Sequence, residues 1–166
     1  MTITGVLITK LDRFEDERGS FSEIANRAGL PVEMSQTSHS HSKRGVLRGL
    51  HFHRTQSDLW YLATGRAQIA LVDLRDPGSV PVQQTWVADS QTPATVFIPP
   101  GVAHGYLALT DIDMLYQTSH EYDPDDEHGL AWNYPQLQIA WDIPDPVLSE
   151  RDRNNPGLTW SDIPRF

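Results

Sequence analysis

The chain has 166 residues and a formal net charge of −9, from 13 basic and 22 acidic side chains. This length favours one domain with a sizeable core, and the charge argues against nucleic acid or an anionic membrane as the main partner. A few arginines in a cleft would still suffice to bind a small anion, and the absence of cysteine excludes disulfides and thiolate chemistry.

The first residues lack the basic start and the long apolar run of a signal peptide. No apolar run approaches the roughly 18–20 residues that a membrane-spanning helix needs. The sequence therefore predicts a soluble cytoplasmic protein that binds neither nucleic acid nor a membrane.

Short runs of strand-forming residues follow one another along most of the chain, with turn residues between them. The predicted strands cover residues 4–11, 19–24, 45–53, 59–64, 67–74, 83–87, 94–98, 104–109 and 113–118. A short helix is predicted over residues 23–29, and a loop-rich tail from Tyr122 onward. Strands this short and this evenly spaced favour an all-β antiparallel sandwich or barrel, formed by a single domain over residues 1–166.

One stretch concentrates polar groups that are costly to bury in an apolar strand. His51 and His53 are two residues apart, so in a strand both imidazoles point to the same face. Arg48 has the opposite parity and is expected on the other face unless a bulge intervenes. Asp58 follows five residues after His53, and Gly65 ends the second strand of a predicted hairpin. Buried imidazoles need a hydrogen-bond partner, a metal or water, so this stretch indicates a functional site.

Several short motifs stand in order along nearly the whole chain. They are Asp16-Glu-Arg-Gly19, Arg48-Gly-Leu-His-Phe, Val72-Asp-Leu-Arg75, Ile98-Pro-Pro-Gly-Val-Ala-His-Gly105, Leu115-Tyr116, Trp132-Asn133 and Leu148-Ser-Glu-Arg-Asp152. In this order they resemble the nucleotide-sugar 3,5-epimerases, the dTDP-4-dehydrorhamnose 3,5-epimerase-like proteins of the cupin superfamily. The resemblance implies a double-stranded β-helix (jelly roll), a homodimer, and chemistry that requires no metal or organic cofactor.

The resemblance further implies epimerisation at C3, C5 or both of a nucleotide-diphosphate-linked 4-keto-6-deoxyhexose, with a dTDP-sugar as the leading candidate. The keto group acidifies the protons at C3 and C5, so a base removes one, an enolate forms, and an acid returns the proton to the other face. By the resemblance His51 is the base, Asp152 orients and polarises it, and Tyr116 is the acid. The positions that would contact nucleotide, phosphate or sugar are Arg18, Glu23, Gln36, Arg48, His104 and Glu127. The product would supply deoxysugar for a surface polysaccharide or a glycosylated natural product.

Two positions depart from the family pattern. The family usually has Gln where this chain has His53, and Lys where it has Asp58. That Lys supports the negative charge of the enolate oxygen in the family. A carboxylate has the wrong sign for this role, because it repels the developing charge.

Both departures fit the metal-binding motif of other cupins. Two glycines stand at the spacing of that motif, and they enclose His51, His53 and Asp58, with Asp in place of Glu. A Pro-Pro-Gly turn further along the chain leads to His104. Three imidazoles and one carboxylate suit Zn, Fe, Ni or Mn. A divalent ion would polarise the keto oxygen in place of the missing Lys. The sequence therefore also supports the hypothesis of a metal-dependent relative, with these four residues as ligands.

The sequence is compatible with three functions. The first is the epimerase, and the second is a metal-dependent cupin enzyme that acts on a small carbonyl or hydroxy compound. The third is a lapsed sugar-nucleotide binder, in which Asp58 marks the loss of support for the enolate oxygen.

Structural interpretations of the same residues also stay open. Tyr116 lies in an apolar run and fits core packing, and Asp152 fits a helix cap or a turn. His39 and His41 form a second pair, which is predicted on a solvated or subunit-facing strand.

Overall fold

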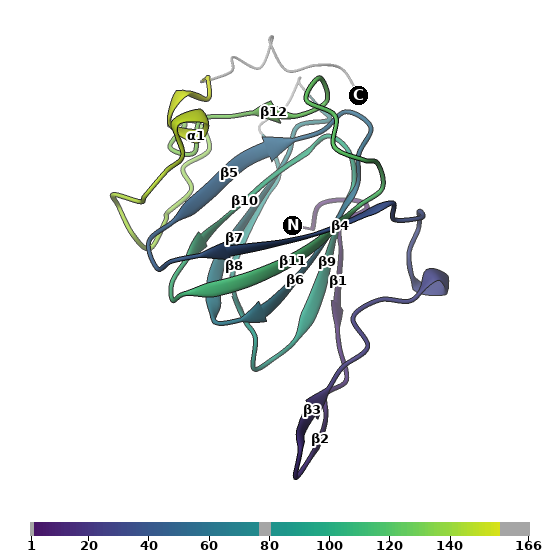
Figure 1. Cartoon of the computed structure of the whole chain (residues 1–166). Helices are drawn as coiled ribbons and strands as arrows, with labels where there is room; N and C mark the ends of the chain where they lie inside the picture. Colours follow the sequence, from purple (N-terminus) through teal and green to yellow (C-terminus); the bar gives the residue numbers. More distant parts are fainter. Residues whose placement is uncertain (1, 77–80, 157–166) are drawn as a thin grey trace.

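In the computed structural model, which describes residues 2–76 and 81–156, most strands form two five-stranded antiparallel sheets (Figure 1). The first sheet contains, in spatial order, β1 (Leu7–Lys10), β9 (Ala94–Ile98), β6 (Asp58–Thr64), β11 (Ile112–Thr118) and β4 (Gln36–Ser42). The second contains β12 (His128–Gly129), β5 (Leu47–Phe52), β10 (Val102–Ala108), β7 (Arg66–Asp73) and β8 (Gln83–Asp89). A separate hairpin pairs β2 (Phe14–Asp16) with β3 (Gly19–Phe21).

The two large sheets pack face to face around an apolar core. Leu62 and Met114 from the first sheet and Ile69 and Leu71 from the second belong to one buried cluster. Alternate residues of these strands point into this core, whereas Ala70 and Val72, on the other face of β7, belong to a second buried cluster with Leu130 and Leu137 of the C-terminal tail. The all-β class is confirmed. No helix among the described residues is long and apolar enough to cross a membrane.

The predicted N-terminal helix over residues 23–29 is wrong apart from its last turn. Only a 3-10 turn, η1 (Arg27–Gly29), forms there, and it ends at Leu30. Pro31 follows Leu30 and disfavours the helical conformation for it, and Leu30 is accordingly extended, with φ −108° and ψ 140°. The tail from Tyr122 is loop-rich as predicted over its described part, residues 122–156, which also contains β12 and the short helix α1 (Glu150–Asn154).

The predicted hairpin between residues 45 and 65 is also wrong. β5 and β6 lie in different sheets, and β6 pairs with β9 and β11 instead. The connecting loop is fixed by a distant carboxylate, since Asp126 accepts the backbone N–H groups of Arg54 and Thr55 at 2.7 and 3.1 Å. Because of this crossing, His53 and Asp58 stand on opposite sheets of the sandwich.

Two glycines allow β5 and β10 to approach closely. A Cβ atom added at Gly49 would lie 2.7 Å from Cα of Gly105, and φ at Gly49 is +126°. The register places His51 opposite His104 but Arg48 opposite Tyr106, with an irregularity between these pairs. Three steps along β5 therefore match two steps along β10, which is a bulge. It brings Arg48 to the same cavity as His51, against the parity of a regular strand.

This close approach makes Gly49 a sensitive position. We expect Gly49→Ala to lower the free energy of unfolding by about 3 kcal/mol or more, because the new atom meets backbone and the positive φ is strained. Gly45→Ala is the matched control: φ is +88°, but no atom lies within 4 Å of the added Cβ. It should cost only about 1 kcal/mol, from the conformation alone. Chemical denaturation compares the two variants, and equal losses would contradict the close approach.

The outer face of β4 and β11 carries an exposed cluster around Asp113. Its carboxylate lies 2.9 Å from Nε2 of His39 and 3.0 Å from Nδ1 of His41, and it accepts a hydrogen bond from Thr64 Oγ1 at 2.7 Å. The hydrogen bond from Thr64, followed by those from the two histidines, lowers the pKa of Asp113 to about 2. His39 and His41 thus share one exposed face of a strand, as predicted.

The low pKa of Asp113 gives a pH-dependent contribution to stability. A carboxyl group whose pKa is lower in the folded state stabilises that state fully above its unfolded pKa, about 4, and loses the effect as the pH falls toward its folded value. We expect Asp113→Asn to lower the melting temperature slightly at pH 7, because the carboxylate is solvent-exposed and screened. The difference from the parent should shrink as the pH falls from 4 toward 2. A difference that grew between pH 4 and pH 2, in thermal unfolding followed by circular dichroism, would contradict this assignment.

Candidate active site

A cavity of about 330 Å³ opens between the two sheets. All predicted site residues except Arg18 and Glu23 line it. They are Gln36, Arg48, His51, His53, Asp58, His104, Tyr116, Glu127 and Asp152. Strands of both sheets and the C-terminal tail therefore contribute to one site.

His51 and Asp152 form a closely bonded pair in this cavity. Nε2 of His51, on β5, lies 2.6 Å from Oδ1 of Asp152, which is buried in the first turn of α1. Ser149 is the N-cap of this helix and accepts the backbone N–H of Asp152 at 3.0 Å, so Asp152 is not itself the cap. Burial opposes the charge on Asp152, but the hydrogen bond from His51 and its electrostatic attraction hold the pKa of Asp152 below its usual value. The carboxylate is therefore charged at neutral pH and orients the imidazole.

Tyr116 lies on the opposite wall of the cavity. It belongs to β11, in the first sheet, and pairs with Trp60 of β6 and Ser38 of β4. Its ring packs on the apolar core between the sheets and also lines the cavity. Tyr116 therefore both packs on the core and lines the site. The imidazole of His51 and the phenol of Tyr116 come from facing sheets.

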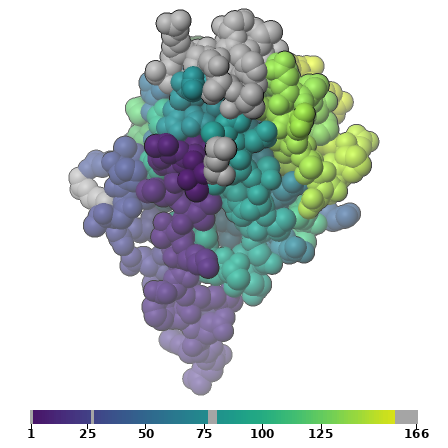
Figure 2. Space-filling model, turned by 180° about the vertical axis from the view of Figure 1, so that it is seen from behind, coloured from purple at the N-terminus to yellow at the C-terminus, as the bar shows by residue number. Residues whose placement is uncertain are grey.

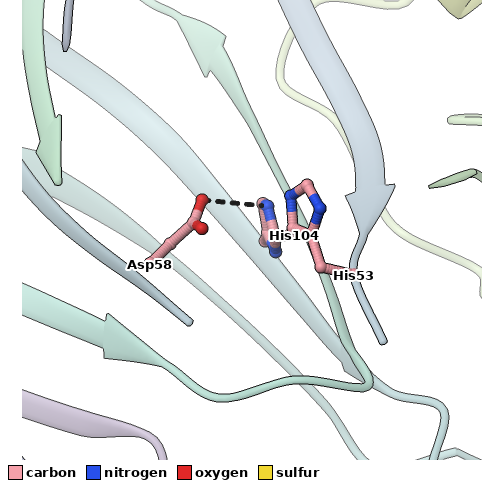
Figure 3. Close-up of side chains that lie close together, drawn as sticks. All are labelled: His53, Asp58 and His104. Carbon is pink, nitrogen blue, oxygen red and sulfur yellow. Dashed lines mark ion pairs between the residues drawn. The ribbon is translucent and has the colours of Figure 1, made fainter. Parts of the chain in front are cut away.

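A second polar cluster is buried deeper in the cavity (Figure 3). Nε2 of His104, on β10, lies 3.4 Å from Oδ2 of Asp58, on β6, and the ring of His53 stacks on that of His104 at 5.6 Å. Burial, together with the nearby imidazoles of His53 and His51, lowers the pKa of His104 to about 4 despite the carboxylate of Asp58. Three of the four predicted metal ligands are thus grouped, whereas His51 is hydrogen-bonded to Asp152.

Sequence reasoning missed Gln56, which belongs to this cluster. Its side-chain Nε2 lies 3.1 Å from Nε2 of His53 and donates to Oδ1 of Asp58 at 2.8 Å. Trp60 also donates to Asp58, from Nε1 to Oδ2 at 3.3 Å. A lone Gln in a loop carries no signal of a site, so only the fold reveals its place.

Two guanidinium groups lie at the cavity. Arg48 donates to Oγ of Ser42 at 3.0 Å and lines the cavity. Arg151 forms an ion pair with Glu127 and lines the same cavity, although sequence reasoning did not select it. Its position next to Asp152 in the Leu148–Asp152 motif was the signal available. Two guanidinium groups suit an anion such as a diphosphate.

Arg18 and Glu23 lie away from the cavity of their own chain. Arg18 is in the turn of the β2–β3 hairpin, where it pairs with Asp16 and has a side chain that is 84% exposed. Glu23 accepts a hydrogen bond from Asn26 at 2.8 Å. The hairpin projects from the sandwich as a separate arm (Figures 1 and 2). The structure therefore does not bring these two predicted substrate contacts to the site within one chain.

Comparison with known proteins gives a consistent result. The model of the dTDP-4-dehydrorhamnose 3,5-epimerase family matches residues 1–159. The dTDP-4-dehydrorhamnose 3,5-epimerase of Pseudomonas aeruginosa is 35% identical, over 98% of this chain and 96% of its own. The spore coat polysaccharide biosynthesis protein SpsL of Bacillus subtilis is 35% identical, over 84% of this chain and 96% of its own.

Solved structures resemble the whole chain. A dTDP-6-deoxy-D-glucose-3,5-epimerase from Legionella pneumophila, in complex with dTDP-4-keto-L-rhamnose, superposes with a TM-score of 0.89 at 28% identity, covering 100% of this chain and 96% of its own. A double mutant of the 3'-monoepimerase ChmJ from Streptomyces bikiniensis, in complex with dTDP, gives a TM-score of 0.90 at 27% identity, covering 100% and 92%. These similarities confirm the predicted jelly roll.

Proposed function

The chain belongs to the dTDP-4-dehydrorhamnose 3,5-epimerase family, and on that premise we propose how its residues epimerise a dTDP-linked 4-keto-6-deoxyhexose. It is an isomerase that acts at C3, C5 or both, and the family needs no cofactor for this reaction. Such sugars serve polysaccharide biosynthesis, as the name of the similar SpsL protein indicates.

One observation supports the proposed mechanism above the others: an imidazole and a phenol from facing sheets line one cavity. Inversion of a carbon needs a proton to leave one face of the ring and return to the other. His51, held by Asp152, stands on one sheet and Tyr116 on the facing sheet. A sugar ring between them would present opposite faces to the two groups.

The proton transfers then follow from the hydrogen bonds. Nε2 of His51 is engaged by Asp152, so Nδ1 takes the proton from C3 or C5. The electron pair of the broken C–H bond moves into the ring as an enolate whose charge is on the keto oxygen. Tyr116 donates its hydroxyl proton to the opposite face of the same carbon, and the charged Asp152 stabilises the imidazolium. Proton exchange with water restores His51 and Tyr116 for the next turnover.

We further propose that the nucleotide diphosphate lies along the guanidinium groups of Arg48 and Arg151. Both line the cavity, and a forked guanidinium binds phosphate oxygens in pairs. Gln36, on β4 at the same cavity, adds an amide for the sugar or the nucleotide. A chain of net charge −9 would in this way present local positive charge to an anionic substrate.

We also propose a homodimer in which the arm of one copy completes the cavity of the other. The arm pairs Phe14 with Phe21, and these side chains are 62% and 65% exposed, an apolar surface that a partner would cover. Arg18 lies at the tip of the same arm. An exchange of arms would bring Arg18 and Glu23, the two predicted contacts that miss their own cavity, to a second active site.

Mixing two defective variants tests this exchange. In a mixed dimer, one chain carries Arg18→Ala and the other carries His51→Asn. If the arms are exchanged, the dimer has one intact site. If each arm serves its own cavity, the dimer has none. Co-expression at equal levels should therefore restore about a quarter of the parent activity, because about half of the dimers are mixed and each has one working site. If the mixture is no more active than the two variants alone, the arm does not serve a second copy.

Solvent deuterium uptake tests the function itself. In D₂O, dTDP-4-keto-6-deoxyglucose should gain deuterium at C3, at C5 or at both, with inversion at the labelled carbon, as followed by NMR. Exchange that occurs only with an added metal would show that the reaction is metal-dependent. Binding of the sugar nucleotide without any exchange would identify a lapsed binder.

A further inference from the structure

Three buried ligand groups from separate parts of the fold converge in the cavity. His53 follows β5, Asp58 begins β6 and His104 lies on β10, and one potential ligand atom from each lies within 4.8 Å of the other two (Figure 3). Each of these residues is at most 9% exposed. Their convergence is not a local effect of one loop, because it depends on the packing of the two sheets.

The hydrogen bonds of the two imidazoles fix which nitrogen faces the cluster. Nδ1 of His104 lies 2.9 Å from the carbonyl oxygen of Val102, and Nδ1 of His53 lies 3.0 Å from that of Asp126. A carbonyl oxygen only accepts, so both Nδ1 atoms carry a hydrogen, and Nε2 of each neutral ring presents a lone pair. Metal-binding histidines are commonly held in this way by their second nitrogen.

The facing atoms are all acceptors, and a positive charge is missing between them. Nε2 of His104 is 3.4 Å from Oδ2 of Asp58, so a lone pair faces a carboxylate oxygen whose neutral donor is Nε1 of Trp60, at 3.3 Å. Gln56 donates to the other carboxylate oxygen and to His53, but not to His104. Over residues 2–76 and 81–156, neither Lys nor Arg forms an ion pair with Asp58. Such an arrangement is unfavourable unless a proton or a cation lies between the groups.

We propose that His53, Asp58 and His104 bind a first-row divalent metal ion, of which Zn²⁺ and Fe²⁺ fit best. Two imidazoles and one carboxylate are the ligand set of both catalytic zinc sites and non-haem iron sites, and they leave coordination positions open. His51 stays with Asp152 and is not a ligand, so the metal and the proposed base are separate parts of one cavity. The amide of Gln56 must turn away from His53 and Asp58 when the ion binds.

The three proposed ligands line the same cavity as His51 and Tyr116, so an ion held by them would be accessible to a substrate there. An ion there would supply positive charge to the keto oxygen as a Lewis acid, which the carboxylate of Asp58 alone cannot do. This role rests on the proposed epimerase function, whereas binding of the ion does not. The two parts are therefore tested by separate measurements.

Calorimetric titration with Zn²⁺ tests the binding. Protein made without an affinity tag and stripped with a chelator should bind one ion per chain, and Co²⁺ should give visible d–d absorption. Asp58→Asn and His104→Gln should each weaken binding by about 100-fold and remove the absorption. The matched control is His39→Gln, in the exposed cluster at Asp113, which should leave both signals unchanged. The proposal fails if the parent binds no ion, if Asp58→Asn binds as tightly, or if His39→Gln removes the signal.

A third variant keeps the test decisive if the ligand variants misfold. Gln56→Ala removes the amide that competes for His53 and Asp58, so it should bind Zn²⁺ several-fold more tightly than the parent. If the cluster holds only a shared proton, neither the parent nor Gln56→Ala will bind Zn²⁺ tightly, and this result would overturn the proposal. Deuterium exchange is then compared in stripped and reloaded protein: faster exchange with the ion supports the Lewis-acid role, and equal exchange overturns that role. Since binding is measured without sugar, its failure leaves the epimerase function standing.

Discussion

Replacing His51 by Asn should lower kcat for epimerisation by about 10²–10⁴-fold, the range that a positioned acid–base group contributes. The amide of Asn keeps a polar group of similar size near Asp152, but it cannot take a proton from carbon at neutral pH. Deuterium uptake at C3 and C5 should fall by the same factor, because this residue performs the first step. Binding of dTDP should change little. Single-turnover NMR and calorimetry measure the two quantities, and His39→Asn, on the exposed face of β4, is the control expected to retain full activity.

Asp152→Asn should give a smaller loss of about 10²-fold, because the imidazole keeps a hydrogen-bond partner but loses the charge that stabilises it. Since the pKa of Asp152 is held below its usual value, the carboxylate is charged at neutral pH. The deficit of Asp152→Asn relative to the parent should therefore be measured by deuterium uptake at pH 7. An Asp152→Asn variant as active as the parent at this pH would contradict the role assigned to the carboxylate.

The strands could be predicted because their signals are local. Residues 94–98 were predicted with the observed bounds, since an apolar alternating run ends at a Pro-Pro-Gly turn. Of the helix predicted over residues 23–29, only the 3-10 turn at Arg27–Gly29 forms, and Pro31 explains why this turn goes no further than Leu30. Local pattern thus identifies most strands, but no bounds were predicted for β4, because its run of Ser and His residues gives no apolar alternation.

The pairing of strands depends on contacts that no local pattern records. The predicted hairpin between residues 45 and 65 required the loop at Arg54 to turn back on itself, yet this loop is held by Asp126, 72 positions along the chain. Likewise Arg48 reaches the cavity through a bulge that depends on the close approach of Gly49 and Gly105. The sequence shows both glycines, but it does not show that they come into contact.

In the site too, local spacing could be interpreted from the sequence, whereas long-range contacts could not. His51 and His53 could be selected from their spacing, but the link from His51 to Asp152 spans 101 positions and came only from the resemblance to a family. Gln56 escaped notice because single polar residues in loops are common, and Arg151, in α1, because only its neighbour Asp152 was assigned a role. Spacing alone also assigned His51 to the metal set, whereas its short hydrogen bond to Asp152 separates it from the other three ligands.

Replacing Tyr116 by Phe should separate proton exchange from inversion. If Tyr116 returns the proton to the face opposite His51, its loss should lower the rate of inversion by about 10²–10⁴-fold. His51 would still remove a proton, exchange it with water and return it to the same face. The variant should therefore incorporate solvent deuterium with retained configuration, and NMR reports label and configuration at each carbon in one experiment.

A second tyrosine in the cavity provides the matched control. The hydroxyl of Tyr106 lies 3.0 Å from Oγ of Ser40 and 3.2 Å from Oγ of Ser42, so it is already engaged by the protein. Tyr106→Phe should cost about 1 kcal/mol of stability from these lost hydrogen bonds, and it should leave the ratio of inversion to exchange unchanged. If Tyr116→Phe slowed exchange and inversion equally, or if Tyr106→Phe alone separated them, Tyr116 would not be the acid. The retained label is decisive because a merely structural loss would reduce both processes together, whereas only the loss of a proton donor on one face separates them.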